Sequence, residues 1–420
     1  MLKSQKNMEF YMKYEEALKL ALESVDVIKE TKLINIEDSL NRVLSKDIYA
    51  LRDFPIYNNS AMDGYGFKYK DINNYLTPIC TILAGDIQKA ILKDNECYKI
   101  MTGAKVPKDC DTVAPKEICT IKDNKIQITK PIKKGNAIRL KGEEIKKGSL
   151  LLKKGERLNA SKIALLASQG INKIECYKEL KIAIISTGSE LKEVGEEATK
   201  NEIYNINGIN IKMHLKEYGI NANYLGVLPD NLEKAVDFFK NITNYNIIIT
   251  TGGVSVGDAD FTKEALIKNG FKELFHGIKV KPGHPTLMGK INKTFIMAMP
   301  GNPLAAITHI ILMGLPLILK MQGAKRLFFR TKEAKITTTL TLKPNRVNIV
   351  LGRFKSGKFK PYKKNSYGSG MILPLVKSNA FVLFSEEIES VKKGSTIKVV
   401  EFLCQPMSKK FDYKCNNLTR

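Results

Sequence analysis

The alternation of apolar runs with amphipathic segments between residues 180 and 270 constrains the fold of this 420-residue chain most strongly. KIAIISTGSEL, ANYLGVLPD and YNIIITT predict buried strands, whereas INGINIKMHLKEYG, NLEKAVDFFKNI and FTKEALIKNG predict helices. Strands and helices that alternate at this spacing are typical of a parallel, doubly wound sheet. We therefore expect a central three-layer αβα domain over residues 180–330.

The strand that ends at Thr250 is followed by a segment rich in glycine and acidic residues. Its small residues are Gly252, Gly253, Ser255 and Gly257, and its acids are Asp258 and Asp260. Glycines let backbone N–H groups approach an anion without interference from a Cβ atom. A cradle of this kind beside carboxylates predicts a phosphate ester held with Mg2+. The alternative is a glycine-rich connection that binds nothing.

Carboxylates also follow two other predicted strands. Glu190 comes after the strand in KIAIISTGSEL, and Asp230 ends ANYLGVLPD. In open α/β sheets, ligands bind at the carboxyl ends of the strands. We therefore expect Glu190 and Asp230 to converge with Asp258 and Asp260 on one crevice.

The segment PGNPLAA predicts a second anion-binding feature. It begins with Pro300, Gly301, Asn302 and Pro303. Pro303 suits the first turn of a helix, whose N–H groups and dipole favour an anion. Lys279 and Lys281 would add positive charge nearby, although solvated surface positions are the alternative for both lysines.

The rest of the chain predicts three further parts and a tail. Short strand-like runs separated by glycine and proline indicate an inserted small β-domain at residues 53–144. Residues 1–52 and 145–179 would form a discontinuous linker domain with helical and extended segments, including an amphipathic helix at residues 12–23. Residues 331–404 indicate a C-terminal β-barrel, and residues 405–420 a tail.

The segment NNSAMDGYGF, at residues 58–67, combines polar residues with glycine. Such residues do not suit the packed interior of a strand or helix, so we interpret the segment as a loop. Aromatic and methionine side chains would anchor this loop. An anchored polar loop usually lines a ligand, although a plain surface loop is the alternative.

The net charge of +25 does not by itself indicate a nucleic-acid-binding protein. Its lysines are spread over the whole chain and no nucleic-acid motif accompanies them, so attraction of a multiply charged anionic substrate is favoured. Neither a membrane-spanning window nor a signal peptide is evident, so we expect a cytoplasmic protein without membrane contact. The seven cysteines lack CxxC spacing, which argues against a disulfide framework and structural zinc.

Seven motifs occur in the order found in one enzyme family: NNSAMDGYGF, IMTGAKVP, IRLKGEEI, ISTGSEL, TTGGVSVGDADF, VKPGHPT and PGNPLAA. The chain thereby resembles the molybdopterin molybdenumtransferases, which are the bacterial MoeA-type enzymes and the E-domain of gephyrin. The resemblance implies a MogA/MoaB-like αβα domain that inserts molybdenum in the last step of molybdenum cofactor biosynthesis. Adenylylated molybdopterin and molybdate would react with Mg2+ to release AMP.

The resemblance also implies partners. It implies a homodimer in which the small β-domain of one chain faces the αβα crevice of the other. Contacts with a molybdopterin adenylyltransferase and with apo-molybdoenzymes are implied as well.

The resemblance assigns roles to individual residues. The implied catalytic residues are Asp63, Thr102, Arg139, Glu144, Glu190, Asp230 and Asp260, of which Glu190, Asp230 and Asp260 are also the implied metal ligands. Asn207 and Ser369 join the glycines and PGNP as implied substrate-binding positions, with Lys281, Pro300 and Pro303 in the family's anion-site motifs. The chain departs from common family residues at Glu144 (Asp), His284 (Lys) and Asn205–Ile206 (Asp-Thr).

Two other functions stay open. The αβα domain also resembles the molybdopterin adenylyltransferases, although those enzymes consist essentially of that domain alone. ATP consumption without a molybdate requirement would favour that activity. A cofactor-binding scaffold is the second alternative, and pull-down of partners with an active-site variant would discriminate it.

Overall fold

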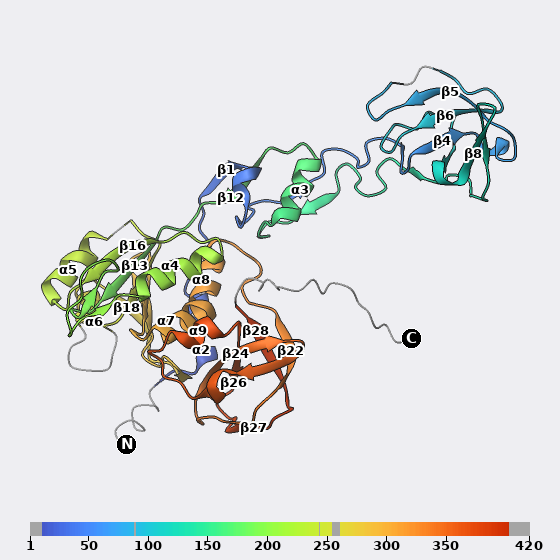
Figure 1. Cartoon of the computed structure of the whole chain (residues 1–420). Coiled ribbons are helices and arrows are strands. Elements are labelled where there is room, and N and C mark those ends of the chain that lie inside the picture. The colour runs from blue at the N-terminus through green and yellow to red at the C-terminus, as the bar shows by residue number, and fades with distance from the viewer. Residues whose placement is uncertain (1–10, 88–89, 243, 254–260, 403–420) are drawn as a thin grey trace.

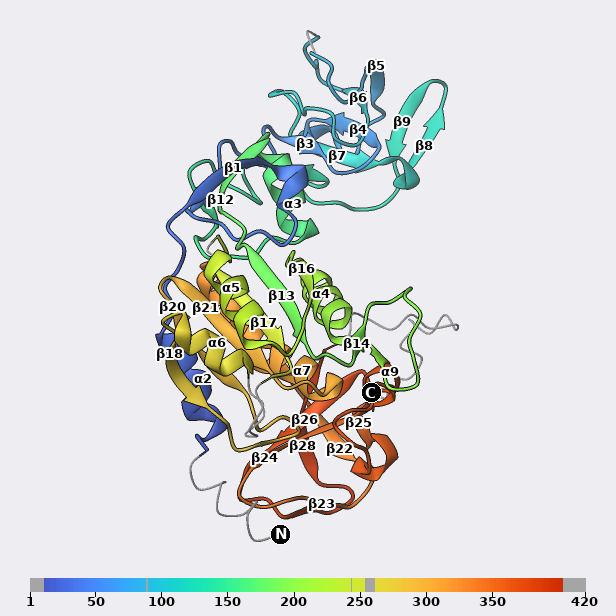
Figure 2. The same ribbon diagram turned by 90° about the vertical axis from the view of Figure 1, so that its left-hand side faces the viewer.

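The computed structural model describes residues 11–87, 90–242, 244–253 and 261–402. It contains four structural parts that follow one another along the molecule. A small β-domain lies at one end, a thin linker follows, and the αβα domain and a β-barrel form the other end (Figures 1 and 2). This arrangement confirms the expected four-part architecture.

The αβα domain contains a six-stranded sheet in the order β16-β13-β17-β21-β20-β18. The strands are β16 (Asn223–Leu228), β13 (Ile182–Thr187), β17 (Ile247–Thr251), β21 (Thr294–Met299), β20 (Leu287–Ile291) and β18 (Lys272–His276). The first four run parallel, while β20 is antiparallel to both β21 and β18. The chain goes from β13 outward to β16 and returns to β17 on the other side of β13. Ligands bind at such a reversal of strand order.

Helices cover both faces of this sheet. One face packs α4 (Asn207–Glu217), α7 (Pro303–His309), α8 (Leu315–Met321) and the N-terminal α2 (Tyr14–Glu23) into the main hydrophobic core. The other face packs α5 (Leu232–Asn241) and α6 (Phe261–Lys268). Successive β13 residues alternate between the two cores, with Ile182 and Ile184 on one side and Ala183 and Ile185 on the other.

The longest apolar helix lies inside the protein. Residues Pro303–Met321 form one 19-residue helix, with a π-helical segment at Ile310–Gly314 between α7 and α8. Among the described residues it is the one helix long and apolar enough to cross a membrane, but 89% of its apolar window is buried within the molecule. Burial of that extent is expected of a core helix. From the sequence we had expected no window long enough to cross a membrane, whereas this helix has that length.

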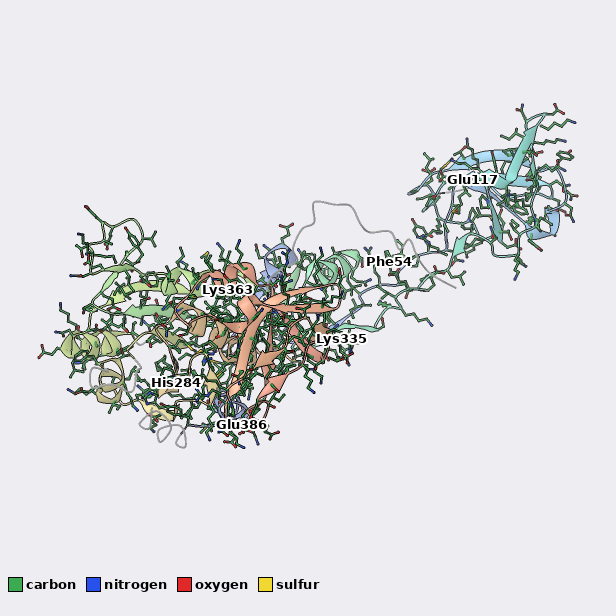
Figure 3. All side chains as sticks on the ribbon, turned by 60° about the horizontal axis from the view of Figure 1, so that its bottom comes forward. Phe54, Glu117, His284, Lys335, Lys363 and Glu386 are labelled. Carbon is green, nitrogen blue, oxygen red and sulfur yellow. The ribbon has the colours of Figure 1, made fainter. Side chains whose placement is uncertain are left out.

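The linker is built from two distant chain segments. β1 (Thr31–Asn35) pairs with β12 (Lys173–Tyr177), and β2 (Ile48–Tyr49) with β11 (Leu150–Leu152). α3 (Ala160–Ser168) packs on these strands and begins at the N-cap Asn159, whose side chain accepts from the Lys162 N–H. Phe54 marks the narrow connection to the small β-domain (Figure 3), where its N–H donates to Ile145 O at 2.7 Å.

The small β-domain is built around a sheet of order β5-β6-β4-β7. Its strands are β5 (Thr77–Ile82), β6 (Glu96–Ile100), β4 (Gly64–Phe67) and β7 (Thr112–Pro115), with the hairpin β8 (Cys119–Lys122) and β9 (Lys125–Ile128) beside them. The short β3 (Asn59–Ser60) pairs with β10 (Ile138–Arg139). Two small cores fill the domain.

The expectation that NNSAMDGYGF is a loop was wrong for its second half. Gly64–Phe67 is β4, a fully buried inner strand paired with β6 and β7. Glycine is required there because a Cβ on Gly64 would lie 2.0 Å from Ala114 O, and one on Gly66 would lie 2.9 Å from Cys110 Sγ. A glycine in the sequence can therefore indicate a strand position that a neighbouring segment approaches closely, and not only a loop.

The C-terminal domain is a closed five-stranded barrel. β24 (Val347–Lys355), β25 (Lys358–Pro361), β22 (Thr331–Ile336), β28 (Thr396–Glu401) and β26 (Ala380–Phe384) pair in turn, and the pairing of β26 with β24 closes the ring. β19 (Val280–Lys281) adds to β24 and ties the αβα domain to the barrel. β23 (Leu340–Thr341), β27 (Ser390–Val391) and α9 (Leu373–Lys377) complete the domain.

Candidate functional site

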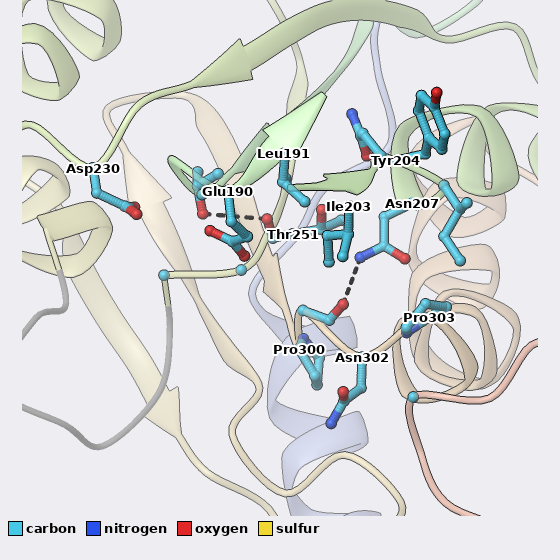
Figure 4. Close-up of a pocket in the computed structure, with 18 of the residues that line it drawn as sticks. Glu190, Leu191, Ile203, Tyr204, Asn207, Asp230, Thr251, Pro300, Asn302 and Pro303 are labelled. Carbon is cyan, nitrogen blue, oxygen red and sulfur yellow. Dashed lines mark hydrogen bonds between the residues drawn. The ribbon is translucent and has the colours of Figure 1, made fainter. Parts of the chain in front are cut away.

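A crevice of about 890 Å³ lies at the carboxyl ends of β13, β17 and β21. Thr187, Thr251 and Pro300 mark these three strand ends in its wall, and Figure 4 labels Thr251 and Pro300. A small arm formed by β14 (Leu191–Lys192) and β15 (Ile203–Tyr204), together with the start of α4, makes another wall. Gly370 of the C-terminal domain completes the lining. The crevice therefore lies where the doubly wound sheet predicts a ligand site.

The glycine cradle after β17 is shaped by two residues with positive φ. Gly252 has φ +88°, and a Cβ there would lie 2.6 Å from Thr187 O. Gly253 has φ +62°, and a Cβ would lie 2.1 Å from Thr262 Oγ1. Only glycine fits both positions without displacing its neighbours. The other candidates of this segment lie outside the described residues: Ser255, Gly257, Asp258 and Asp260.

Glu190 and Asp230 both line the crevice and stay solvent-exposed. Asp230 Oδ2 accepts from the Ser189 N–H at 2.9 Å, and Ser189 Oγ accepts from the Asp230 N–H at 3.1 Å. This reciprocal pair fixes the Asp230 side chain, which points toward Glu190 in Figure 4. Within the described part of the chain, neither carboxylate makes a salt bridge. Both are thus available to a cation.

The two carboxylates suit magnesium. Mg2+ usually takes one or two carboxylates from a protein and completes its shell with water and substrate phosphate. No group of three or more His, Cys, Asp or Glu side chains that would hold a metal occurs among the described residues. The donor set of Glu190 and Asp230 therefore fits a magnesium ion shared with a phosphate ester.

PGNP lies beside the glycine cradle because β17 and β21 are parallel neighbours. The Gly252 N–H donates to Met299 O at 3.2 Å, and the Asn207 side chain donates from Nδ2 to Gly301 O at 2.7 Å. Ser369 of the C-terminal domain accepts from Asn302 Nδ2 at 2.9 Å. Asn207, Asn302 and Ser369 are thereby brought together with the cradle.

The helix start at Pro303 offers fewer free donors than its sequence predicts. Proline has no N–H, the Leu304 N–H donates to Ser369 O at 3.2 Å, and the Ala306 N–H donates to Asn302 O at 2.9 Å. Three of the first four positions are therefore not available to an anion. The carbonyl of Ser369 occupies the place where we expected an oxyanion to bind.

Lys279 and Lys281 do not belong to the crevice wall, although Pro285 of the same loop does. Lys281 lies instead near Lys343 and Arg346, and partial burial together with these two cations lowers the pKa of Lys281. None of the three cations makes a salt bridge within the described residues. His284 does not restore the missing lysine charge, because burial and Arg346 lower its pKa.

The fully buried His309 on α7 holds this loop in place. Its Nε2 lies 3.0 Å from Pro282 O, and its Nδ1 lies 2.7 Å from Thr286 Oγ1. Burial lowers the pKa of His309 to about 4, so the ring is neutral. Since a carbonyl only accepts, Nε2 carries the proton and Nδ1 accepts from the Thr286 hydroxyl.

We expect His309 to make the fold sensitive to acid. A histidine whose pKa is lowered on folding stabilises the protein above its unfolded pKa of about 6.5, and this contribution is lost as pH falls toward 4. The contribution at neutral pH is roughly 3 kcal/mol. His309→Gln should lower the free energy of unfolding at pH 7.5 but not at pH 4.5, as measured by urea unfolding. His214→Gln on α4 is the control, and an equal loss at both pH values would contradict the assignment.

The remaining candidates lie in or beside the small β-domain, which Figure 1 shows far from the αβα domain of the same chain. Asp63 Oδ1 accepts from the Thr102 N–H at 2.9 Å and from the Thr102 hydroxyl at 2.8 Å, and these bonds lower the pKa of Asp63. Arg139 and Glu144 line a second cavity of about 370 Å³ with Phe54.

A buried polar network under the crevice wall was not predicted from the sequence. The Ser186 hydroxyl donates to Asn205 Oδ1 at 3.0 Å, and Asn205 Nδ2 donates to the Tyr224 hydroxyl at 2.5 Å. Tyr224 in turn donates to Glu193. An aspartate at position 205 would meet the Glu193 carboxylate, so Asn205 suits its neighbours here. Asn205, which stands where aspartate is common in the family, was the one signal of this network in the sequence.

Comparison with known proteins accounts for nearly the whole chain. Residues 12–170 match the MoeA N-terminal region (domains I and II), residues 183–320 a probable molybdopterin binding domain, and residues 333–402 the MoeA C-terminal region (domain IV). The molybdopterin molybdenumtransferase of Haemophilus influenzae is 33% identical over 399 residues, covering 92% of this chain and 98% of the relative. That of Staphylococcus epidermidis is 32% identical, covering 92% and 94%.

A solved structure has the same architecture. The molybdopterin biosynthesis MoeA protein of Pyrococcus horikoshii OT3 superimposes with a TM-score of 0.79 at 28% identity. The match covers 93% of this chain and all of that chain.

Proposed function

The chain belongs to the molybdopterin molybdenumtransferases, which insert molybdenum in molybdenum cofactor biosynthesis, and we propose that it uses adenylylated molybdopterin, molybdate and Mg2+ and releases AMP. One observation carries the proposal. Glu190 and Asp230, which form no salt bridge with any residue that the structure describes, line the same crevice as the glycine pair Gly252–Gly253. A phosphoanhydride with a bound magnesium ion needs this combination of donors.

The residues of the crevice would orient the phosphates for cleavage. The Gly252 N–H already donates to Met299 O, so Gly253 is the residue of the glycine pair whose N–H would bind a phosphate oxygen, while Glu190 and Asp230 would hold Mg2+. When bound, Mg2+ offsets the negative charge that builds on the bridging oxygen. Ser189 fixes Asp230 through two hydrogen bonds, so the carboxylate needs little reorganisation during the reaction.

We propose that a second copy of the chain completes the site. Asp63, Thr102, Arg139 and Glu144 belong to residues 53–144, the small β-domain, which lies far from the αβα domain in one subunit (Figure 1). A homodimer with the small β-domain of one chain against the αβα crevice of the other would bring them to the substrate. We place this enzyme in the cytoplasm, where it would receive substrate from a molybdopterin adenylyltransferase and pass product to apo-molybdoenzymes.

The function is tested by incubating the protein with adenylylated molybdopterin, MgCl2 and molybdate. We expect AMP release that depends on molybdate, together with reconstitution of an apo-molybdoenzyme. ATP consumption without a molybdate requirement would identify an adenylyltransferase instead. Binding of the substrate without AMP release would leave a scaffold role.

Lys281 is expected to help bind molybdate. Lys281, Lys343 and Arg346 gather positive charge that no described acid neutralises, and a charge-assisted hydrogen bond contributes about 1.5–3 kcal/mol. Lys281→Gln should therefore raise the molybdate concentration for half-maximal AMP release about 10-fold or more. Lys293→Gln, in an exposed turn, is the matched control. An unchanged molybdate dependence would remove Lys281 from the oxyanion site.

A further inference from the structure

Asn207 presents a hydrogen-bond acceptor to the crevice without a partner. It is the first residue of α4, only 9% exposed, and it lines the crevice. Its Nδ2 donates to Gly301 O at 2.7 Å (Figure 4). A carbonyl oxygen can only accept, so this bond fixes which end of the amide is nitrogen. The other end, Oδ1, is buried and has no hydrogen-bond partner among the described residues.

An unpaired buried acceptor of this kind destabilises the protein by about 1–3 kcal/mol. Native structures contain few such groups, and those that line a ligand site are usually paired by the ligand. The Asn207 side chain cannot rotate to find another partner without breaking its bond to Gly301. We therefore expect the missing donor to come from a molecule in the crevice.

The surroundings of Asn207 suit a flat, uncharged ring. Three large apolar side chains of the arm and the α4 start line the crevice while staying exposed: Ile203 (59%), Tyr204 (49%) and Ile206 (36%). Exposed apolar side chains at a ligand site favour an aromatic surface. Asp230 and Glu190 lie on the opposite side of the crevice from Asn207 in Figure 4. If the phosphates and the metal of a ligand bind at Glu190 and Asp230, its ring system would lie on the side of Asn207.

We propose that Asn207 Oδ1 accepts a hydrogen bond from an exocyclic amino group of a flat nitrogen heterocycle that packs on Ile203 and Ile206. This inference rests on the proposed function, because the adenylylated substrate carries two such rings. The pterin has a 2-amino group and the adenine a 6-amino group. Asn207 is thus a specificity residue that would reject rings without an amino donor, since they leave its carbonyl unpaired.

Binding experiments with paired ligands test the proposal and separate the two rings. The adenine pair is AMP and purine riboside 5′-monophosphate, which lacks the 6-amino group. The pterin pair is 6-hydroxymethylpterin and its analogue without the 2-amino group. Dissociation constants for all four are measured by calorimetry on the full chain, on Asn207→Ala and on Asn210→Ala. Asn210 lies one turn further along α4 and does not line the crevice.

In one of the two pairs, the unchanged chain should bind the ligand with the amino group at least about 10-fold more tightly than the ligand without it. Asn207→Ala should reduce this ratio to about one, whereas Asn210→Ala should keep it. The pair that shows the effect identifies the ring. Equal binding within both pairs, or a ratio that survives in Asn207→Ala, would overturn the proposal.

A purely structural role for Asn207 gives a different result. Loss of the bond to Gly301 would weaken both ligands of a pair equally and leave their ratio unchanged, which also overturns the proposal. Molybdate-dependent AMP release by the unchanged chain is measured on the same preparation. Its presence without amino discrimination would leave the proposed function standing while this inference fails.

Discussion

Glu190→Gln is expected to reduce molybdate-dependent AMP release by about 100-fold or more while leaving the fold intact. Glutamine has the shape of glutamate but lacks the negative charge that would hold Mg2+. Glu190 is exposed and makes no salt bridge within the described residues, so no structural partner is lost. Cleavage of the phosphoanhydride builds negative charge on the bridging oxygen, so its rate depends steeply on the positive charge of a bound Mg2+. The measurement is AMP formed per minute at saturating adenylylated molybdopterin.

Two comparisons make this result specific. Glu197→Gln removes the same charge from an exposed position outside the crevice wall and should leave the rate unchanged. Raising the Mg2+ concentration should recover part of the activity of Glu190→Gln, because Asp230 is still present to bind the ion. A Glu190→Gln variant with full activity at low Mg2+ would exclude Glu190 from the metal site.

The αβα domain could be predicted from the sequence because its strands are buried on both faces. Every residue of β13, from Ile182 to Thr187, is buried, and the strand begins with the uninterrupted apolar run Ile182–Ile185. The positions of Glu190 and Asp230 followed from one topological rule, since parallel strands end at the same edge of the sheet. Periodicity and strand direction thus sufficed to predict the crevice and the positions of Glu190 and Asp230 in it.

Contacts between distant segments could not be predicted in this way. Asn207 and Gly301 are 94 residues apart in the chain, and Asn302 meets Ser369 from another domain. Neither pair leaves a periodic signal, because each depends on how the C-terminal domain and α4 dock. The same docking places Ser369 O on the Leu304 N–H and so reduces the free donors at the helix start. Local sequence predicts such a helix terminus but not what covers it.

The small β-domain shows a different limit of sequence patterns. In GYGF, glycine alternates with Tyr65 and Phe67, and we expected a loop because glycine is poor in strand interiors. The structure shows instead that Gly64 is needed because the backbone of Ala114 on β7 passes where a side chain would be. A sequence alone does not distinguish a glycine that permits a turn from one that permits this contact.

Gly64→Ala is therefore expected to destabilise the small β-domain by about 3 kcal/mol or more. The new Cβ would lie 2.0 Å from Ala114 O, a backbone atom held by the pairing of β4 with β7, so relief requires the two strands to separate. Gly66→Ala should have a smaller effect of about 1 kcal/mol, because its Cβ would meet the end of the Cys110 side chain at 2.9 Å.

Two buried thiols of this domain report the outcome directly. Cys97 is 0% and Cys110 6% exposed, so both react with a thiol reagent only when the domain opens. When opening and closing of the domain are faster than the labelling reaction, the labelling rate follows the free energy of opening. Lowering this free energy by about 3 kcal/mol should accelerate labelling of Cys97 by about 100-fold, and lowering it by about 1 kcal/mol should accelerate labelling by about fivefold. Cys176 in the linker should label at its original rate in both variants, because its core is separate. Equal labelling rates in Gly64→Ala and Gly66→Ala would show that β4 can move away from β7, and the steric account of this strand would then fail.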